Sequence, residues 1–499
     1  MKRRVAATPP GSTTRRDIEG EDVRLLTLSS YVAPGRGKRH LFASSTQATF
    51  VAVAVWLSVL VGERMPRLSD VRWWGMGALG VFMVVQAPRW CLLLVLCLVG
   101  VAGGAAAWSA DVVIETTECN GVGYLRSDPS PLFGGTRATV ELHDMRYSAS
   151  AHGAAGSRLA QRSAGESVMV RGTCSPLIGD FARSNRVRHI VGTFAIDEVS
   201  EHFAEGSIVL RAANRIRDAM QQGVAGMGAN HKSLFTGLVI GDDRLQPRDM
   251  VQRFRVSGLS HLCAASGQNV AYLLAVATPF MRRRSARVKW LITLCIIGCF
   301  IVLTRAEPSV LRAGFMAGAV ATNALRQHPM NARAVLAISV ICLLMIDPML
   351  AWSIGFALSV GATAGLAWLS APLGKICGGR GVLASTLAAQ LGTLPVSLAV
   401  FGSVPVVSLV ANPLALPVAG AVMTVGLPLS LLASLLPGLV GPVSLLLTVP
   451  VAWVDGVAHI ASRVSPTGHV NAALWIAVAL WVVARWVRKK GGRPTAVAG

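Results

Sequence analysis

The chain has 499 residues, of which 53% are hydrophobic and only 14% are charged, and its mean hydropathy is +0.53. About a quarter of the residues of a soluble globular protein are charged, so this composition excludes that class and predicts a polytopic α-helical membrane protein. The net charge of +22 agrees with an excess of arginine and lysine in cytoplasmic loops and with attraction to anionic lipid, but a polyanionic ligand such as DNA would favour the same bias.

The amino-terminal part predicts a tail followed by a membrane block. Residues 1–45 are polar and basic and are expected to form a disordered cytoplasmic tail. Apolar runs near 46–62, 73–87 and 90–108 predict a three-helix block over 46–108. Three crossings from a cytoplasmic start place the next segment outside the cell membrane.

The segment 111–205 has a different pattern. Polar and apolar residues alternate in Thr136–His143 and Glu166–Thr173, and His189–Val199 is a third candidate strand. Short turns between alternating runs predict a small extracytoplasmic β domain, expected to be a five-stranded barrel of the OB type.

Two of the nine cysteines, Cys119 and Cys174, lie in this predicted β domain. A lone pair of cysteines in an extracytoplasmic domain predicts a disulfide. No CxxC or HxxxH spacing accompanies the pair, so a metal site is not expected.

Residues 207–241 predict amphipathic or interfacial helices between the β domain and a second membrane block. In 207–222, Val209, Ala213, Ile216 and Met220 fall on one helical face, and the apolar run 232–241 is too short to span a bilayer.

The segment 256–487 predicts a second membrane block with nine spans, which brings the total to about 12 transmembrane helices. Basic loops alternate with loops of low charge, and this alternation predicts that both termini, including the basic tail 488–499, are cytoplasmic. The run 405–436 contains Asn412, Pro413, Pro417 and Pro428 and is interpreted as a broken helix. The nine spans are expected near 256–280, 288–304, 309–325, 333–347, 350–370, 381–402, 405–436, 440–461 and 471–487.

The first of these spans is unusually polar. Within Ser257–Pro279 lie His261, Ser266, Gln268 and Asn269, together with two glycines that permit a break in the helix. Unpaired polar groups are costly at membrane depth, so these four side chains are predicted to line a path or a site rather than to anchor the chain.

Arg305 and Arg312 flank the next polar patch, RAEPSVLR. Two interpretations stay open: an interfacial Arg–Glu pair, or a pair of arginines that contact phosphate. Arg312 is better placed for function because it lies inside the apolar stretch. Asp347 and Pro348 predict a sharp, structural turn between two spans.

No catalytic constellation is evident. The chain has no Walker loop and no HxHxDH cluster, and the Ser257–His261 pair has no acid partner nearby in the sequence. The sequence therefore predicts a protein that is not an enzyme and that has no catalytic residues, no metal and no cofactor.

Three segments, in this order and spacing, resemble ComEC-type competence proteins. Leu238–Val270 is similar to that family's "LGD" element followed by "F…SGLSHLLAISGLHV". Pro308–Ala313 and Asp347–Ser359 resemble the next two patches of the family, the second of which reads "DP…SPGFQLS" there. The resemblance covers about residues 46–487, and it implies that 256–487 is a competence-type channel domain.

The resemblance implies a channel in the inner or plasma membrane that translocates single-stranded DNA into the cytoplasm during natural transformation. His261, Ser266, Gln268 and Asn269 would line the channel, and Arg305 and Arg312 would guide phosphates near its outer mouth. The implied partners are single-stranded DNA, membrane lipid, a cytoplasmic helicase-like ATPase and an external DNA receptor, and a homo-oligomer is compatible with this role.

The sequence differs from the family pattern in two respects. Many members have a carboxy-terminal metallo-β-lactamase-like domain, and the chain is expected to lack it because it ends twelve residues after the last predicted span. A separate nuclease would then degrade the second strand, if it is degraded. The family's "GLHV" reads Gly267-Gln268-Asn269-Val270 here, so an amide replaces a titratable histidine.

The alternatives are a small-molecule or lipid transporter, and a structural membrane protein whose polar helix packs against its neighbours. The β domain discriminates between the channel and the transporter, since a transporter of small solutes has little use for a barrel of the nucleic-acid-binding type.

Overall fold

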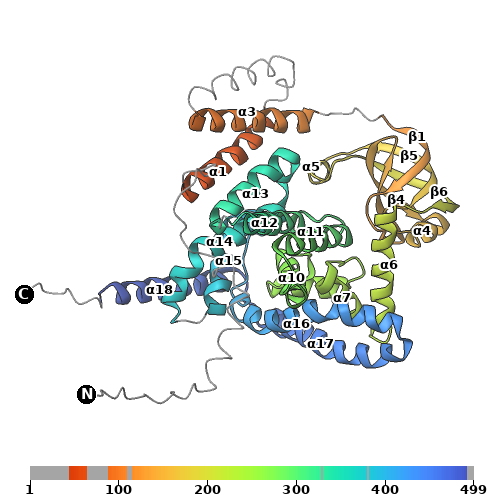
Figure 1. Cartoon of the computed structure of the whole chain (residues 1–499). Helices are drawn as coiled ribbons and strands as arrows, with labels where there is room; N and C mark the ends of the chain where they lie inside the picture. The colour runs from red at the N-terminus through yellow and green to blue at the C-terminus, as the bar shows by residue number, and fades with distance from the viewer. Residues whose placement is uncertain (1–43, 65–87, 110–114, 328–329, 379–380, 492–499) are drawn as a thin grey trace, which may run out of the picture.

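The computed structural model describes residues 44–64, 88–109, 115–327, 330–378 and 381–491. Within these residues a small sheet domain lies beside a larger body of helices (Figure 1). The predicted span 73–87 and almost all of the predicted tail 1–45 lie outside the described residues.

The sheet domain has six strands in the order β1-β5-β6-β4-β3-β2. Because β1 also pairs with β3, the five longer strands form a closed ring, and the three-residue β2 pairs only with β3. The neighbours β4 and β6 are parallel, and the other pairs are antiparallel. The sequence predicted five strands, and β2 is the additional one. The strands are β1 (Thr117–Leu125), β2 (Ser130–Leu132), β3 (Gly135–Leu142), β4 (Met145–His152), β5 (Ser167–Pro176) and β6 (Ile190–Ala204).

Alternation along the strands builds the core of this domain. The three strands predicted from alternation are confirmed as β3, β5 and β6. On β3 the side chains of Ala138, Val140 and Leu142 are buried, whereas the residues between them face outward, as the two-residue period of a strand requires. Two short helices interrupt the strands: α4 (Gly153–Ala160) precedes β5, and α5 (Asp180–Arg186) precedes β6.

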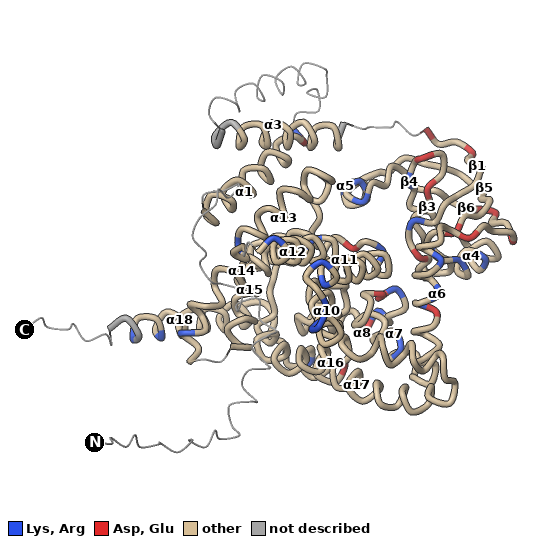
Figure 2. The backbone as a smooth tube through the Cα atoms, in the orientation of Figure 1, with Lys and Arg blue, Asp and Glu red and all other residues tan. Residues whose placement is uncertain are grey.

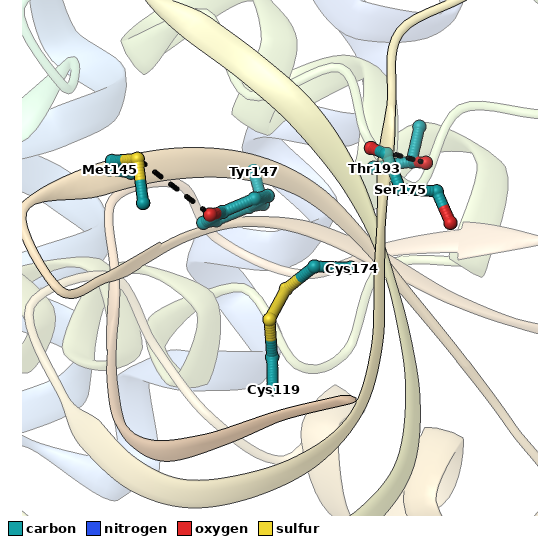
Figure 3. The surroundings of a disulfide bond; sticks show 6 residues. All are labelled: Cys119, Met145, Tyr147, Cys174, Ser175 and Thr193. Atoms are coloured by element: carbon teal, nitrogen blue, oxygen red, sulfur yellow. Dashed lines mark hydrogen bonds between the residues drawn. A yellow bond between two sulfur atoms is a disulfide. The ribbon is translucent and has the colours of Figure 1, made fainter. Parts of the chain in front are cut away.

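Cys119 on β1 and Cys174 on β5 form a disulfide in the interior of the sheet domain (Figure 3). The two strands are antiparallel neighbours, and the Cα atoms of the two cysteines are 5.8 Å apart. The bond joins residues 55 positions apart in the sequence, so it restricts a long loop of the unfolded chain.

Replacing both Cys119 and Cys174 with serine is expected to destabilise the sheet domain by about 2–5 kcal/mol, because the unfolded domain regains the freedom of that loop. The measurement is the thermal unfolding midpoint of the purified protein without reductant. Cys299→Ser, which changes an exposed free thiol on the helical body, is the control and should leave the midpoint unchanged. A wild-type midpoint in the double variant would contradict this expectation.

The rest of the described chain is helical. Its helices are α1 (Ser45–Gly62), α3 (Pro88–Ser109), α6 (Ile208–Gly223), α7 (Ala229–Ile240), α8 (Arg248–Val256), α9 (Ser260–Cys263), α10 (Gly267–Met281), α11 (Ala286–Leu303), α12 (Pro308–Leu325), α13 (Ala332–Ile346), η4 (Pro348–Trp352), α14 (Ile354–Ile376), α15 (Gly381–Phe401), α16 (Ser408–Leu435), η5 (Pro437–Leu439), α17 (Val440–Val464) and α18 (Gly468–Gly491).

Seven helices of the described residues are long and apolar enough to cross a membrane: α1, α11, α14, α15, α16, α17 together with η5, and α18. The helices α3 and α13 contain shorter apolar stretches, Leu92–Trp108 and Ala332–Ile346. The expected count of about twelve spans therefore stays a prediction.

The expected span over 256–280 is not one helix. After α8, Gly258 takes a left-handed conformation with φ +74°, and the single turn α9 is followed by extended backbone at Ala264 and Ser266 before α10 begins. The polar sequence SGLSHLCAASGQN therefore forms a turn, a short helix and the first turn of α10.

The expected break within 405–436 is absent. The helix α16 continues from Ser408 to Leu435 with Pro413, Pro417 and Pro428 inside it. One side of this helix packs against α10, α7 and α6 through buried small residues such as Ala415 and Ala419. Tertiary packing thus maintains the helix through residues that would interrupt an isolated one.

The helices α14 and α15 are in backbone contact. A Cβ atom added at Gly365 would lie 2.0 Å from the carbonyl oxygen of Ala388, and one added at Gly392 would lie 2.1 Å from that of Gly361. Small residues at such positions let two membrane helices approach closely.

Candidate functional site

A cavity of about 3790 Å³ extends from the sheet domain into the helical body. The helix α12 lines it from Pro308 to Leu325, which is the whole helix. At 1.5 Å per residue, 18 residues correspond to roughly 27 Å, close to the thickness of the hydrocarbon core of a bilayer. In Figure 1 the helices α10, α11 and α12 occupy the space between the sheet domain and α14 and α15.

The described lining of the cavity is strongly basic. Its acidic residues are Glu307 and Asp347. Its basic residues are Arg126, Arg137, Arg146, Arg188, Arg255, Arg282, Lys289, Arg305, Arg312 and Arg333. Figure 2 shows basic residues on β4, α5, α11 and α12 and in the turn after α10. Such a lining attracts anions along its length.

The polar segment before and within α10 reaches this cavity. His261, Ser266 and Gln268, three of the four residues predicted to line a path, are among the lining residues. The Ser266 hydroxyl donates a hydrogen bond to Oδ1 of Asn269 at 2.9 Å, and Nε2 of Gln268 donates to the Tyr272 hydroxyl at 2.6 Å. Neutral amides and hydroxyls therefore form this part of the wall.

Asn269, the fourth of these residues, is not among the lining residues. Its side chain is only 3% exposed, and Nδ2 donates to the carbonyl oxygens of Leu238 and Val239 at 3.0 and 3.4 Å. These carbonyls lie in the last turn of α7, so Asn269 links the carboxyl end of α7 to the first turn of α10. In the structure it positions the segment that lines the cavity.

Arg312 lies in the second turn of α12, lines the cavity and is only 5% exposed. Its Nε donates to the Ser359 hydroxyl on α14 at 2.9 Å, and Nη1 is 3.1 Å from the Met316 sulfur. Among the described residues, no carboxylate lies within 4.0 Å of it. Burial of a guanidinium without a counter-ion has a free-energy cost, and a bound anion would reduce that cost.

Arg305 also lines the cavity, but its charge is already paired. Its Nη2 and Nε lie 2.7 and 2.9 Å from the two carboxylate oxygens of Asp128, in the loop after β1. Nη2 also donates to the Asn214 side chain on α6 at 2.6 Å. The structure therefore places Arg305 at the junction between the sheet domain and the helical body.

Asp128 is the centre of a buried ion cluster, which we define as Asp128, Asp242, Arg217, Arg244 and Arg305. Arg217 lies 3.1 Å from Asp128, and Arg244 lies 3.7 Å from Asp128 and 2.7 Å from Asp242. Burial alone would raise the pKa of the Asp128 carboxyl, but the hydrogen bond from Arg305 and the charges of the three arginines hold this pKa well below its usual range. The cluster fixes the sheet domain to the helices.

A second contact joins the two bodies on another side of the cavity. His189, at the start of β6, lies 3.2 Å from the Asp347 carboxylate in the turn before η4, and both residues line the cavity. Arg183 on α5 lies 2.8 Å from Glu63 at the end of α1. The turn predicted at Asp347 and Pro348 thus also contacts the sheet domain.

Two further walls of the cavity were not anticipated from the sequence. On α14 the lining includes Ser359, Thr363 and Ser370, spaced four and seven residues apart. The lining of α15 includes Gln390, Thr393 and Ser397. These spacings place each set on one helical face, and this periodicity of hydroxyls in apolar helices is the signal that could have revealed them.

In the described part of the chain, no three His, Cys, Asp or Glu side chains are grouped so that they could hold a metal ion.

Comparison with known families decides the relationship that the sequence suggests. The family model described as "Competence protein" matches residues 238–490, more than half of the chain. The chain belongs to the competence protein family. No curated protein and no solved structure gives a significant match.

Membership of the competence protein family indicates a role in DNA uptake during transformation. The seven apolar helices and the family together are consistent with a membrane protein. The competence region contains the polar segment of α10, Arg305 and Arg312, whereas the sheet domain precedes it.

Proposed function

We propose that this protein is a channel that translocates single-stranded DNA across the cell membrane into the cytoplasm during natural transformation, and that the basic cavity is the path. The observation that carries this proposal is one continuous cavity with ten basic and two acidic lining residues, which follows α12 over its full length. A polyanion of extended shape fits such a lining better than a small neutral solute or a lipid does.

The distribution of charge along the path supports passage rather than tight binding. Arg312 is the single charged residue of α12, and the wall beyond it combines apolar side chains with hydroxyl and amide side chains of α14 and α15. Basic residues recur at the far side of the cavity: Arg282 follows α10, and Lys289 and Arg333 lie in the first turns of α11 and α13. A conduit needs sites that attract an ion but do not hold it.

The pairing of the strands supports an OB-type barrel for the sheet domain. The ring β1-β3-β4-β6-β5-β1, with its one parallel pair β4–β6 and a helix between β4 and β5, is the arrangement expected of that fold. We place this domain outside the cell membrane, where it would meet incoming DNA, and the disulfide suits that compartment.

The proposal includes a multi-pass protein with about twelve spans and both termini in the cytoplasm. In it the chain is not an enzyme and needs no cofactor. A cytoplasmic helicase-like ATPase supplies the driving force, an external receptor delivers the DNA, and a separate nuclease removes the second strand. A homo-oligomer is compatible with a path that lies within one chain.

The test is the fate of labelled double-stranded DNA in a competent host that lacks the gene, with and without the complementing gene. We expect transformants to be lost on deletion while labelled DNA still accumulates outside the cell membrane, and complementation should restore uptake. Unchanged transformation in the deletion strain would overturn the proposal and favour a transporter or a structural role.

A further inference from the structure

The outward surface of two strands forms one part of the cavity wall that the sheet domain contributes. We define the β3–β4 face as Arg137, Thr139 and Glu141 of β3 with Ser150, Ser148 and Arg146 of β4, which are cross-strand partners in that order. Arg137, Thr139, Arg146 and Ser148 line the cavity. Every side chain of the face is an arginine, a hydroxyl or a carboxylate.

Glu141 organises the arginines at one end of this face. Its carboxylate accepts from Nε of Arg126 at 2.8 Å and from Nε of Arg146 at 3.1 Å. Arg126 and Arg146 remain 49% and 39% exposed, whereas Glu141 is 14% exposed. The hydrogen bond from Arg126, stronger than the opposing effect of burial, lowers the pKa of Glu141. Two partly exposed arginines paired with one largely buried carboxylate leave a net positive charge beside the cavity.

The exposed aromatic residues of the sheet domain lie elsewhere. Tyr124, Phe133 and Phe203 are 53%, 92% and 46% exposed, and none of them lines the cavity. Among the described lining residues that the sheet domain contributes, there is no Phe, Tyr or Trp. Proteins that bind single strands by their bases stack those bases on aromatic side chains.

We propose that the β3–β4 face holds the sugar–phosphate backbone of DNA and neither stacks nor reads its bases, so that it accepts double and single strands alike. This inference rests on the proposed function and names the surface that incoming DNA would contact first. Arginine guanidinium groups match phosphate geometry, and serine and threonine hydroxyls donate to phosphate oxygens. Duplex DNA can therefore dock on this face before one strand enters the part of the cavity that the helices line.

The first experiment uses the full-length protein in discs of neutral phosphatidylcholine and compares three fluorescent probes. They are a 30-nucleotide thymidine strand, an abasic deoxyribose-phosphate strand of equal length, and a 30-base-pair duplex. We expect the abasic and thymidine strands to bind within about threefold of each other. Stacked bases would each contribute enough for removal of the bases to weaken binding by more than about tenfold.

The second experiment changes the face. In Arg137→Ser/Arg146→Ser, each serine resembles its hydroxyl neighbours, and Glu141 keeps Arg126 as a partner. The slope of log K against log salt for the thymidine strand should become shallower by about 1.4, since each lost phosphate contact accounts for about 0.7. Arg171→Ser, an exposed arginine on β5 outside the lining, and Phe133→Ala are controls expected to keep the wild-type slope and affinity.

A thymidine strand that binds more than about tenfold tighter than the abasic strand would overturn backbone recognition and leave the channel proposal intact. Weaker binding of DNA by Phe133→Ala, with no change in the double arginine variant, would also overturn backbone recognition and leave the channel proposal intact. Absence of binding by all three probes at low salt would overturn the inference, and the deletion-strain assay would still decide the proposed function independently.

Discussion

Replacing Arg312 with leucine is expected to reduce transformation by at least about 30-fold while the protein still inserts and accumulates normally. The guanidinium is buried in the cavity wall and has no carboxylate partner among the residues that the structure describes, so in the proposed path a passing phosphate would be the anion that it stabilises. Loss of a buried, hydrogen-bonded charge contact has a cost of about 2–5 kcal/mol, which corresponds to this range of rates. The measurement is the frequency of transformants per cell, normalised to the amount of protein in the membrane.

Leucine at position 312 should not harm folding, because it removes a buried charge and retains apolar contact with Met316. Arg312→Lys retains the charge but loses the fixed donor to Ser359, so we expect an intermediate frequency. Arg463→Leu, an exposed arginine outside the described lining, is the matched control. Wild-type transformation in Arg312→Leu would remove this residue from the path.

Asp128→Asn is expected to loosen the sheet domain from the helical body at a cost of about 3–5 kcal/mol, because Arg305 would lose its carboxylate partner and Arg217 and Arg244 would keep Asp242 alone. The thermal unfolding midpoint should fall by more than about 5 °C. Protease cleavage between β6 and α6 should become faster. Glu118→Gln removes an exposed carboxylate that lies 4.0 Å from Arg171 and should change neither measurement.

The pH dependence of this effect has a defined sign. The folded-state pKa of Asp128 is depressed, so its contribution to stability is fully present above the unfolded-state pKa of about 3.9 and is lost as the pH falls below that value. The difference in midpoint between wild type and Asp128→Asn should therefore be constant from about pH 5 to 8 and should shrink below about pH 4. A difference that grows on acidification would contradict the assignment.

Local periodicity was sufficient to predict the elements whose structure depends on neighbours in sequence. Alternation located β3, β5 and β6, and length and apolarity located the seven long helices. It could not predict that α16 continues through three prolines, because contacts with α10, α7 and α6 maintain that helix.

The candidate site was predicted in part for the same reason. The polarity of His261, Ser266 and Gln268 is a local signal, and these residues do line the cavity. For Arg305 the sequence left open an Arg–Glu pair or a phosphate contact, and it could not reveal the partner Asp128, which lies 177 residues away. Asn269 was predicted to line the path, but its side chain donates to carbonyl oxygens of α7. These acceptors lie about 30 residues earlier and have no signature in the sequence.

Because α14 and α15 are in backbone contact, the helices on the two sides of the cavity differ in how freely they can move. At Gly365 and Gly392 there is no room for even a methyl group between the two helices. Sliding or separation would break this close packing, so we expect α14 and α15 to move as one rigid pair. Opposite them, α10 begins after the extended backbone at Ser266, and the preceding loop contains the left-handed Gly258. In the proposed channel, a widening that admits a nucleotide would therefore fall to α10 and α12, with its hinge in the polar segment between α8 and α10.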